Sequence, residues 1–432
     1  MKASYVKRSL LETLSYMETE RFSYVKRPRA DFTRRRKCSF QNLLRCLLTM
    51  ENHSLNRELR RFFPSSDTVL TSSAFCQQRA KLNEQALPAF LSLINEKMPF
   101  GKCFKGFHLV AVDGSDINIP PAENSPDTYV PSNTEGVGYH QMHLNALYDL
   151  REERYTDILV QPRASIDERA AFLDLLQAYS VPGRTIFIAD RGYFSLNVLA
   201  HLLSSGHYFL LRTTTADSPS SFFKRFSLLD TARFDVPLEF DITRSQKRCY
   251  RDHPDRIVPI RPDRTFDFIP LADRKSLFHV SVRFVKVQLP GGPEYLLTNL
   301  PADSFGLPLL KKLYSMRWGI ETSFRFLKYT FSLTSFHSIR RDFIRQEIYA
   351  RVIMYNLTRL LIHTVVLPKS LRDKYKVSVS EAAFTCRCFL LGQISLSRAI
   401  TSLAHYLTRI RPGRAYPRKV RNQRNKPLNN RT

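Results

Sequence analysis

Two acidic residues stand where apolar segments with strand-like character give way to turn-forming residues. Residues 107–112 lead to Asp113, and residues 185–189 lead to Asp190. Each pattern predicts a β-strand with a carboxylate at its C-terminal end, which is the edge where ligands approach open α/β sheets. Either aspartate alone is equally typical of an ordinary turn. If the two strands are neighbours, however, the pair can share one or two divalent cations.

A second set of chemically active side chains lies on a predicted helix over residues 313–331. At 100° per residue its apolar residues fall within an arc of about 80°: Leu313, Met316, Ile320, Phe324, Leu327 and Phe331. Four polar residues fall within an adjoining arc of about 60°: Tyr314, Arg317, Glu321 and Lys328. The helix therefore buries one side and presents a phenol, a guanidinium, a carboxylate and an ammonium beside it. The simpler alternative is a surface ion pair between Arg317 and Glu321, worth a few tenths of a kcal/mol.

The net charge indicates a polyanionic partner. The chain has 66 Lys and Arg against 39 Asp and Glu, a net charge of +27, and nucleic acid is the commonest polyanion. One basic run comprises Lys26, Arg27, Arg29, Arg34, Arg35, Arg36 and Lys37. It predicts a contact with a phosphate backbone, the alternative being a solvated loop. From Thr401 the last 32 residues hold nine Lys or Arg and no acid, which predicts a disordered basic tail.

Other classes of protein fit the sequence poorly. The seven cysteines are scattered and contain no Cys-x-x-Cys pair, which argues against a disulfide framework and a zinc ribbon. Glu12, Glu18 and Glu20 interrupt any apolar signal segment. The most apolar stretch, residues 357–367, contains Arg359 and His363 and is too short to span a bilayer. We therefore expect a soluble protein of a reducing compartment, with no membrane partner.

The elements that must position these residues predict a mixed α/β sheet. Three strands over residues 107–113, 142–147 and 156–160 form a meander. A helix that begins with a Ser165–Glu168 capping box, a strand, a short helix capped by Ser195 and a further strand follow, so the order is β-β-β-α-β-α-β. The expected divisions are a helical N-terminal region (1–100), a first core part (101–212), a mainly β insertion (213–298), a second core part (299–370), and a C-terminal helical segment with the tail (371–432).

The motifs resemble those of one enzyme family. Tyr314-x2-Arg317-x3-Glu321-x6-Lys328 is similar to the Tyr-Arg-Glu-Lys signature of the DDE transposases of the insertion-sequence-four family. Asp113-Gly-Ser resembles the first catalytic motif of that family, and Ile188-Ala-Asp190-Arg-Gly-Tyr193 resembles its second. The order Asp, Asp, long gap, Glu also agrees, with room in the gap for a β insertion.

The resemblance implies a ribonuclease-H-like core that is flanked by helices and interrupted by the insertion. It also implies which residues bind metal and which bind DNA. The catalytic, metal-binding triad would be Asp113, Asp190 and Glu321, and it would use Mg²⁺, with Mn²⁺ able to substitute. The DNA-binding residues would be Tyr314, Arg317, Lys328 and, from the end of a core strand, Arg212. The protein would bind the terminal inverted repeats of its element through the N-terminal helical region and the insertion, then cleave them and join them to target DNA. It would act as a homodimer on double-stranded DNA in the prokaryotic cytoplasm.

Several alternatives remain open at this point. A metal-dependent nuclease that cuts without joining, or an inactive DNA-binding derivative, would carry the same motifs. A tyrosine recombinase would use His337-Ser-Ile-Arg340 with Tyr349 or Tyr355 as nucleophile and no metal. Glu347 is a weaker candidate for the third carboxylate because it lacks the flanking signature. Asp116, three residues after Asp113, is interpreted as a structural or outer-shell carboxylate.

Overall fold

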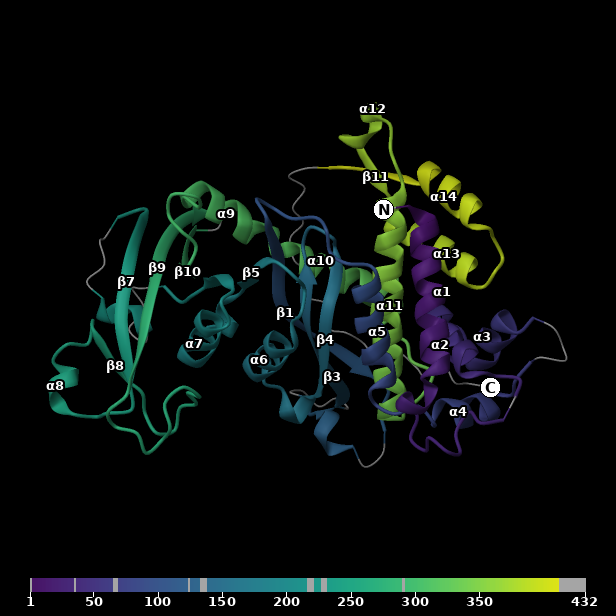
Figure 1. Cartoon of the computed structure of the whole chain (residues 1–432), viewed down its shortest axis with the longest axis horizontal. Helices are drawn as coiled ribbons and strands as arrows, with labels where there is room; N and C mark the ends of the chain where they lie inside the picture. The colour runs from purple at the N-terminus through teal and green to yellow at the C-terminus, as the bar shows by residue number, and fades with distance from the viewer. Residues whose placement is uncertain are drawn as a thin grey trace.

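The computed structural model describes residues 2–34, 36–64, 69–122, 125–132, 138–215, 221–226, 231–289 and 292–411. Within these ranges one sheet of ten strands runs through the molecule, in the order β2-β3-β1-β5-β6-β10-β9-β7-β8, with β4 paired to β3 (Figure 1). The core strands are β1 (Phe107–Ile119), β2 (Tyr129–Val130), β3 (Tyr139–Asp149), β4 (Arg154–Pro162), β5 (Arg184–Ala189) and β6 (Tyr208–Arg212). The sheet continues with β7 (Phe234–Thr243), β8 (Ile257–Pro259), β9 (Leu277–Leu289) and β10 (Gly292–Thr298).

The directions of the core strands confirm the predicted fold class. Strands β1, β3 and β4 form an antiparallel meander, whereas β5 pairs parallel with β1 and β6 pairs parallel with β5. The two parallel connections pass through α6 (Glu168–Ala178) and α7 (Leu196–Ser204). A meander followed by two parallel strands, each reached through a helix, is the ribonuclease-H-like arrangement.

Both faces of the core sheet are covered, which explains why β5, β6 and the first half of β1 are mainly apolar. Side chains alternate along β1: Val110 and Val112 pack with the apolar faces of α6 and α7. Leu109 belongs to the opposite cluster, with Leu310 and Leu313 of α9 (Leu307–Met316). Ala111 joins the large cluster that includes α10 (Trp318–Tyr329). The sheet is therefore a rigid layer between two groups of helices.

The segment expected as a mainly β insertion is continuous with the core sheet. Strand β10 pairs antiparallel with β6, from Leu296 opposite Arg212 to Thr298 opposite Leu210. Strands β9, β7 and β8 then add beyond β10. An unpaired β6 would present free backbone groups at an edge, and β10 satisfies them. The short helix α8 (Arg248–Arg251) lies in this part of the chain.

The remaining helices gather around the long helix α11 (Arg341–Thr364), on the side of the core away from β7 and β8 (Figure 1). They are α1 (Ala3–Thr19), α2 (Phe40–Thr49), α3 (Leu55–Phe62), α4 (Ser72–Arg79), α5 (Ala86–Lys97), α13 (Val379–Leu390) and α14 (Leu396–His405). The short α12 (Lys369–Arg372) and the pair β11 (Tyr375–Val377) and β12 (Leu407–Arg409) complete the chain. In the described ranges no helix is both long enough and apolar enough to cross a membrane.

Some local predictions differ from the structure. The predicted capping box is wrong, because α6 begins at Glu168 and its N-cap is Asp167, whose carboxylate accepts from the N–H groups of Arg169 and Ala170. Ser195 does cap α7, as predicted. The segment expected as a disordered tail begins within α14 and continues into β12, where strand pairing orders it. The rest of the tail, residues 412–432, and Arg35 of the basic run lie outside the described residues.

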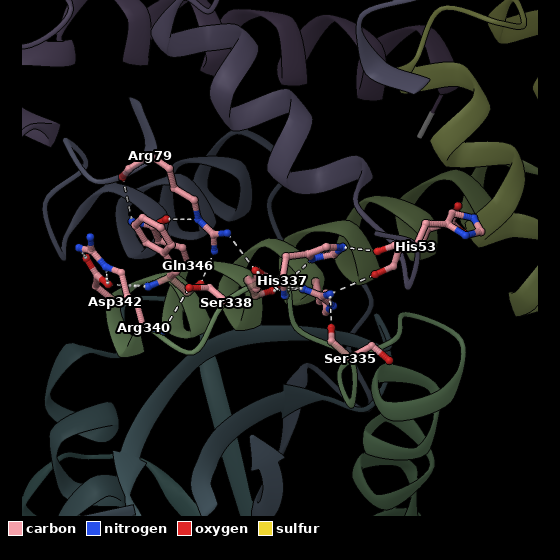
Figure 2. A network of polar contacts seen from close by, with 12 residues as sticks. His53, Arg79, Ser335, His337, Ser338, Arg340, Asp342 and Gln346 are labelled. Atoms are coloured by element: carbon pink, nitrogen blue, oxygen red, sulfur yellow. Dashed lines mark hydrogen bonds and ion pairs between the residues drawn. The ribbon is translucent and has the colours of Figure 1, made fainter. Parts of the chain in front are cut away.

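A buried ion network joins the N-terminal helices to the core (Figure 2). Its centre is Glu347 of α11, which is fully buried. The carboxylate accepts from the guanidinium of Arg79 at 2.9 Å and from that of Arg351 at 3.1 Å. His337 approaches the same carboxylate through Nδ1 at 3.1 Å, and its Nε2 lies 3.0 Å from the carbonyl oxygen of His53. Burial works against ionisation, but His337 and the two guanidiniums outweigh it and hold the pKa of Glu347 well below its usual value.

We expect the substitution Glu347→Gln to destabilise the whole fold, because it leaves two buried guanidiniums without their anion. The expected loss in the free energy of unfolding is about 3–5 kcal/mol, measured by urea denaturation near neutral pH. The matched control is Glu84→Gln at an exposed position, which should change that free energy by about 0.5 kcal/mol or less. Equal, small effects of the two substitutions would show that the network does not stabilise the fold.

Candidate active site

The two aspartates predicted at strand ends lie on neighbouring parallel strands. Strands β1 and β5 are in register up to Val112 opposite Ala189, so Asp113 and Asp190 each follow a paired residue. Asp190 does end its strand. Asp113 does not, which corrects the prediction: β1 continues to Ile119 because β3 still pairs with it. Asp113 therefore marks the position where the parallel partner stops and one edge of β1 becomes free.

The polar residues expected on one helix lie on two, which meet at Arg317. The backbone of Arg317 remains right-handed helical, with φ −49° and ψ −33°. The hydrogen bonds on either side of it span three residues, from Arg317 N–H to Tyr314 C=O and from Ile320 N–H to Arg317 C=O, each 3.1 Å long. This is the tighter 3₁₀ pattern. A Cβ at Gly319 would lie 2.8 Å from Cδ2 of Leu150, so the absence of a side chain there lets α10 pack against the turn after β3.

Three carboxylates converge on the guanidinium of Arg317. Its Nη1 lies 3.4 Å from Oδ2 of Asp113, and its Nη2 lies 3.0 Å from Oε1 of Glu321 and 3.9 Å from Oδ2 of Asp190. The Arg317 side chain is 5% exposed, while the three carboxylates are 22 to 34% exposed. The expected surface pair between Arg317 and Glu321 thus exists, but as one contact of a half-buried cluster built from β1, β5 and α10.

Two more of the predicted DNA-binding residues surround Asp190. The Tyr314 hydroxyl donates to Oδ1 of Asp190 at 3.4 Å, and Nη1 of Arg212 donates to the same oxygen at 3.3 Å. Arg212 also forms an ion pair with Glu294 of β10. Lys328 lies two turns beyond Glu321 on α10. Burial lowers the pKa of its ammonium group, and the charge of Asp116 opposes that effect. The structure therefore gathers every predicted site residue but Lys328 around the two aspartates.

Burial and neighbouring charges shift the pKa values of Asp113 and Asp190 in opposite directions. Burial raises the pKa of Asp113 to about 6, with Glu321 and Glu168 adding to the effect and Arg317 opposing it. Burial also works against ionisation of Asp190, but the N–H of Arg191 and the guanidiniums of Arg317 and Arg212 outweigh it, so its pKa lies below the usual value. Negative charge is thus crowded around Asp113 and balanced around Asp190.

Two residues that the sequence motifs do not include, His143 and Glu168, lie beside Gly114, the residue after Asp113. His143 of β3 is 6% exposed; its Nδ1 lies 2.7 Å from Oδ1 of Asp116, and its Nε2 lies 3.2 Å from Oε1 of Glu168. Asp116 is thus the partner of a histidine, and the hydrogen bond from His143 lowers its pKa. The only sign of this contact in the sequence is that a glycine follows Asp113. A Cβ at Gly114 would lie 2.2 Å from Nε2 of His143, so a larger residue would not fit there.

The side chains fit a hard divalent cation. Carboxylate oxygens are the donors that Mg²⁺ and Mn²⁺ prefer, and three carboxylates already surround one positive group. The Tyr193 hydroxyl is buried and has no hydrogen-bond partner in the described part of the chain. Burial raises its pKa, and the charges of Glu168, Asp113, Arg317 and Asp190 also affect that pKa. As they stand, no three acidic, His or Cys side chains in the described ranges enclose a cation site. The position between the three carboxylates is taken by the guanidinium of Arg317.

The residues of the rival assignments have structural roles. His337 and Glu347 belong to the buried network of Figure 2. Tyr355 is fully buried, and its hydroxyl is hydrogen-bonded to Tyr148 at 2.9 Å. The hydroxyl of Tyr349 donates to the carbonyl oxygen of Ile158 at 2.9 Å. Neither tyrosine is placed to attack DNA, and Glu347 lies outside the carboxylate cluster.

Comparison with known proteins gives one clear relationship. The family model described as a transposase DDE domain matches residues 105–357, which is more than half of the chain. Among solved structures, the chain is similar to piggyBac transposase in a synaptic complex with hairpin DNA, at 10% sequence identity and a TM-score of 0.48, over 96% of this chain and 87% of that one. The comparison with curated proteins found no match.

Proposed function

The chain belongs to the transposase DDE domain family, and on that premise we propose that it is a DNA transposase that cleaves the ends of its element and joins them to target DNA. The observation that supports the proposal best is the convergence of Asp113, Asp190 and Glu321 on one cationic centre. These carboxylates come from two rigid strands and a helix that packs on them, so their positions are set by the core.

In this proposal some site residues bind the metal and others bind DNA. Asp113, Asp190 and Glu321 would hold Mg²⁺, or Mn²⁺ in its place, and the bound metal would stabilise the attacking and leaving oxygens of the phosphodiester. The Arg317 guanidinium, no longer between the carboxylates, would bind a DNA phosphate as a two-pronged donor. Tyr314 and Arg212, which now contact Asp190, would orient neighbouring phosphate oxygens, and Lys328 would add a positive charge further along α10.

We propose further that the protein is a member of the insertion-sequence-four family and its Tyr-Arg-Glu-Lys subgroup. In support, Tyr314 and Arg317 of that signature contact the carboxylate cluster, to which Glu321 of the signature itself belongs. The proposal includes a homodimer that brings the two terminal inverted repeats together, acting on DNA in the prokaryotic cytoplasm.

A basic cavity supports DNA binding by the N-terminal helices. It has a volume of about 580 Å³ and is lined by Glu18, Arg21, Arg29, Ala30, Phe32, Thr33, Arg34, Arg36, Cys38, Ser39, Phe40, Gln78 and Lys81. Its acid, Glu18, already accepts from the N–H of Gln41. Arg29, Arg34 and Arg36 are exposed, and within the described ranges they form no ion pair. Such uncompensated positive charge attracts the phosphate backbone.

The catalytic assignment predicts that Glu321→Gln abolishes cleavage while preserving DNA binding. The substrate is a duplex carrying the DNA that flanks this gene, incubated with Mg²⁺ or with EDTA. Losing one metal-binding carboxylate removes several kcal/mol of transition-state stabilisation, so cleavage should fall at least about a hundredfold. Glu239→Gln, at an exposed position of β7, is the control and should cut like the wild type.

The products of the same assay separate the alternatives. Cutting by Glu321→Gln at the wild-type rate would refute the assignment of the third carboxylate. Metal-dependent cutting by the wild type without any joined product would identify a nuclease. Binding without cutting under any metal would identify an inactive DNA-binding protein.

The basic cavity predicts a non-specific contribution to affinity. Replacing Arg29, Arg34 and Arg36 by alanine should weaken binding to every DNA sequence. It should also reduce the slope of log K against log salt by about 0.9 for each phosphate that the protein no longer neutralises, as measured by fluorescence anisotropy in low and in moderate salt. The charge-matched control replaces Lys369, Lys374 and Lys376, which are exposed in the segment that runs from α12 into β11. Equal salt slopes for the two triple variants would place the DNA contact elsewhere.

A further inference from the structure

We propose that Glu168 is a fourth carboxylate of the metal site and that His143 is the residue that positions it. The inference rests on the proposed function, because it concerns the same divalent cation. It adds to that function a metal-binding side chain from α6, which lies outside the transposase motifs. It also assigns to His143 the task of positioning that side chain.

The carboxylate of Glu168 lies between the two aspartate motifs. Glu168 is the first residue of α6, so its side chain extends from the helix end that faces the sheet edge. Its Oε1 would lie 2.8 Å from a Cβ at Gly114, the residue after Asp113. Its Oε2 would lie 3.7 Å from a Cβ at Gly192, two residues after Asp190. Both glycines thus border the space that the Glu168 carboxylate occupies.

The imidazole of His143 contacts that carboxylate at an ion-pair distance, with Nε2 3.2 Å from Oε1. The ring lies between two acids: Asp116, which is its Cα partner across the β1–β3 pairing, and Glu168 from α6. Because Asp116 engages Nδ1 at 2.7 Å, Nε2 is directed toward Oε1 of Glu168. Partners of this kind orient metal-binding carboxylates and hold them in one conformation. The other oxygen of Glu168 and its remaining lone pairs are left for a cation.

An unpartnered hydroxyl gives independent evidence for a ligand here. Tyr193 is 2% exposed, and its Oη has no hydrogen-bond partner among the described residues. Burial raises the pKa of this hydroxyl, the charges of Glu168, Asp113 and Asp190 add to the effect, and Arg317 opposes it. A buried hydroxyl left unsatisfied is unfavourable. A polar ligand or water bound beside these carboxylates would satisfy it.

The glycine of the first motif is explained by the same arrangement. A methyl group at position 114 would lie 2.2 Å from Nε2 of His143 and 2.8 Å from Oε1 of Glu168. Alanine would therefore push His143 away from Glu168. Glycine at this position keeps the imidazole and the carboxylate together directly beside Asp113.

The test is the affinity of the metal-free, full-length protein for Mn²⁺, measured by isothermal titration calorimetry without DNA. We expect Glu168→Gln to weaken binding about tenfold or more, and His143→Gln and Gly114→Ala to weaken it in the same direction. Glu168→Asp, which keeps the charge, should fall between the wild type and Glu168→Gln. Asp174→Asn, an exposed carboxylate on the same helix, is the matched control and should bind like the wild type. Melting temperatures without metal show that each variant is folded.

Asp113→Asn separates this inference from the proposed function. If Asp113→Asn abolishes Mn²⁺ binding while Glu168→Gln binds like the wild type, Glu168 is not part of the site, and the proposed function stands. If the wild type binds no Mn²⁺, both proposals are overturned. If both substitutions weaken binding and Asp174→Asn does not, the fourth carboxylate is established.

Discussion

The structure of the site depends on one interaction, the contact of the buried Arg317 guanidinium with three carboxylates. Asp113, Asp190 and Glu321 would repel one another in this half-buried position unless a positive group lay between them. The fold supplies that group from the same helical segment that supplies Glu321. In the proposed function a divalent cation would replace Arg317 as the partner of the carboxylates, and the guanidinium would then bind a DNA phosphate.

The rest of the fold can be understood as the support for that contact. The register of β1 and β5 places the two aspartates side by side. The tight turn at Arg317 and the absence of a side chain at Gly319 bring α10 down onto the turn after β3. Helix α11 and the network around Glu347 tie the N-terminal helices to the core. DNA held by those helices would therefore be held at a fixed distance from the carboxylates.

Much of this could be predicted from the sequence because it depends on local patterns. The alternation of apolar residues gives the strands, and the helical period gives the stripe that buries Leu313 and Ile320. The exact end of β1 was not predictable, since it depends on pairing with β3 across a turn. The break at Arg317 has no proline or glycine at its own position, so no local signal marks it.

The contacts of the remaining site residues lie beyond any local pattern. His143 and Glu168 belong to segments that meet only through the register of β3 and the start of α6, so no spacing in the sequence could reveal their contact. Glu347 and His337 show the converse: residue types suited to catalysis can be structural when burial, which the sequence does not display, surrounds them with fixed partners.

The most direct test of the account is the location of a bound metal. Crystals of the protein grown with Mn²⁺ would show the ion by its anomalous scattering. We predict a peak coordinated by Asp113, Asp190 and Glu321, with the Arg317 guanidinium moved out of the centre of the cluster. A Mn²⁺ peak away from these carboxylates, or a guanidinium that stays between them at saturating metal, would contradict it.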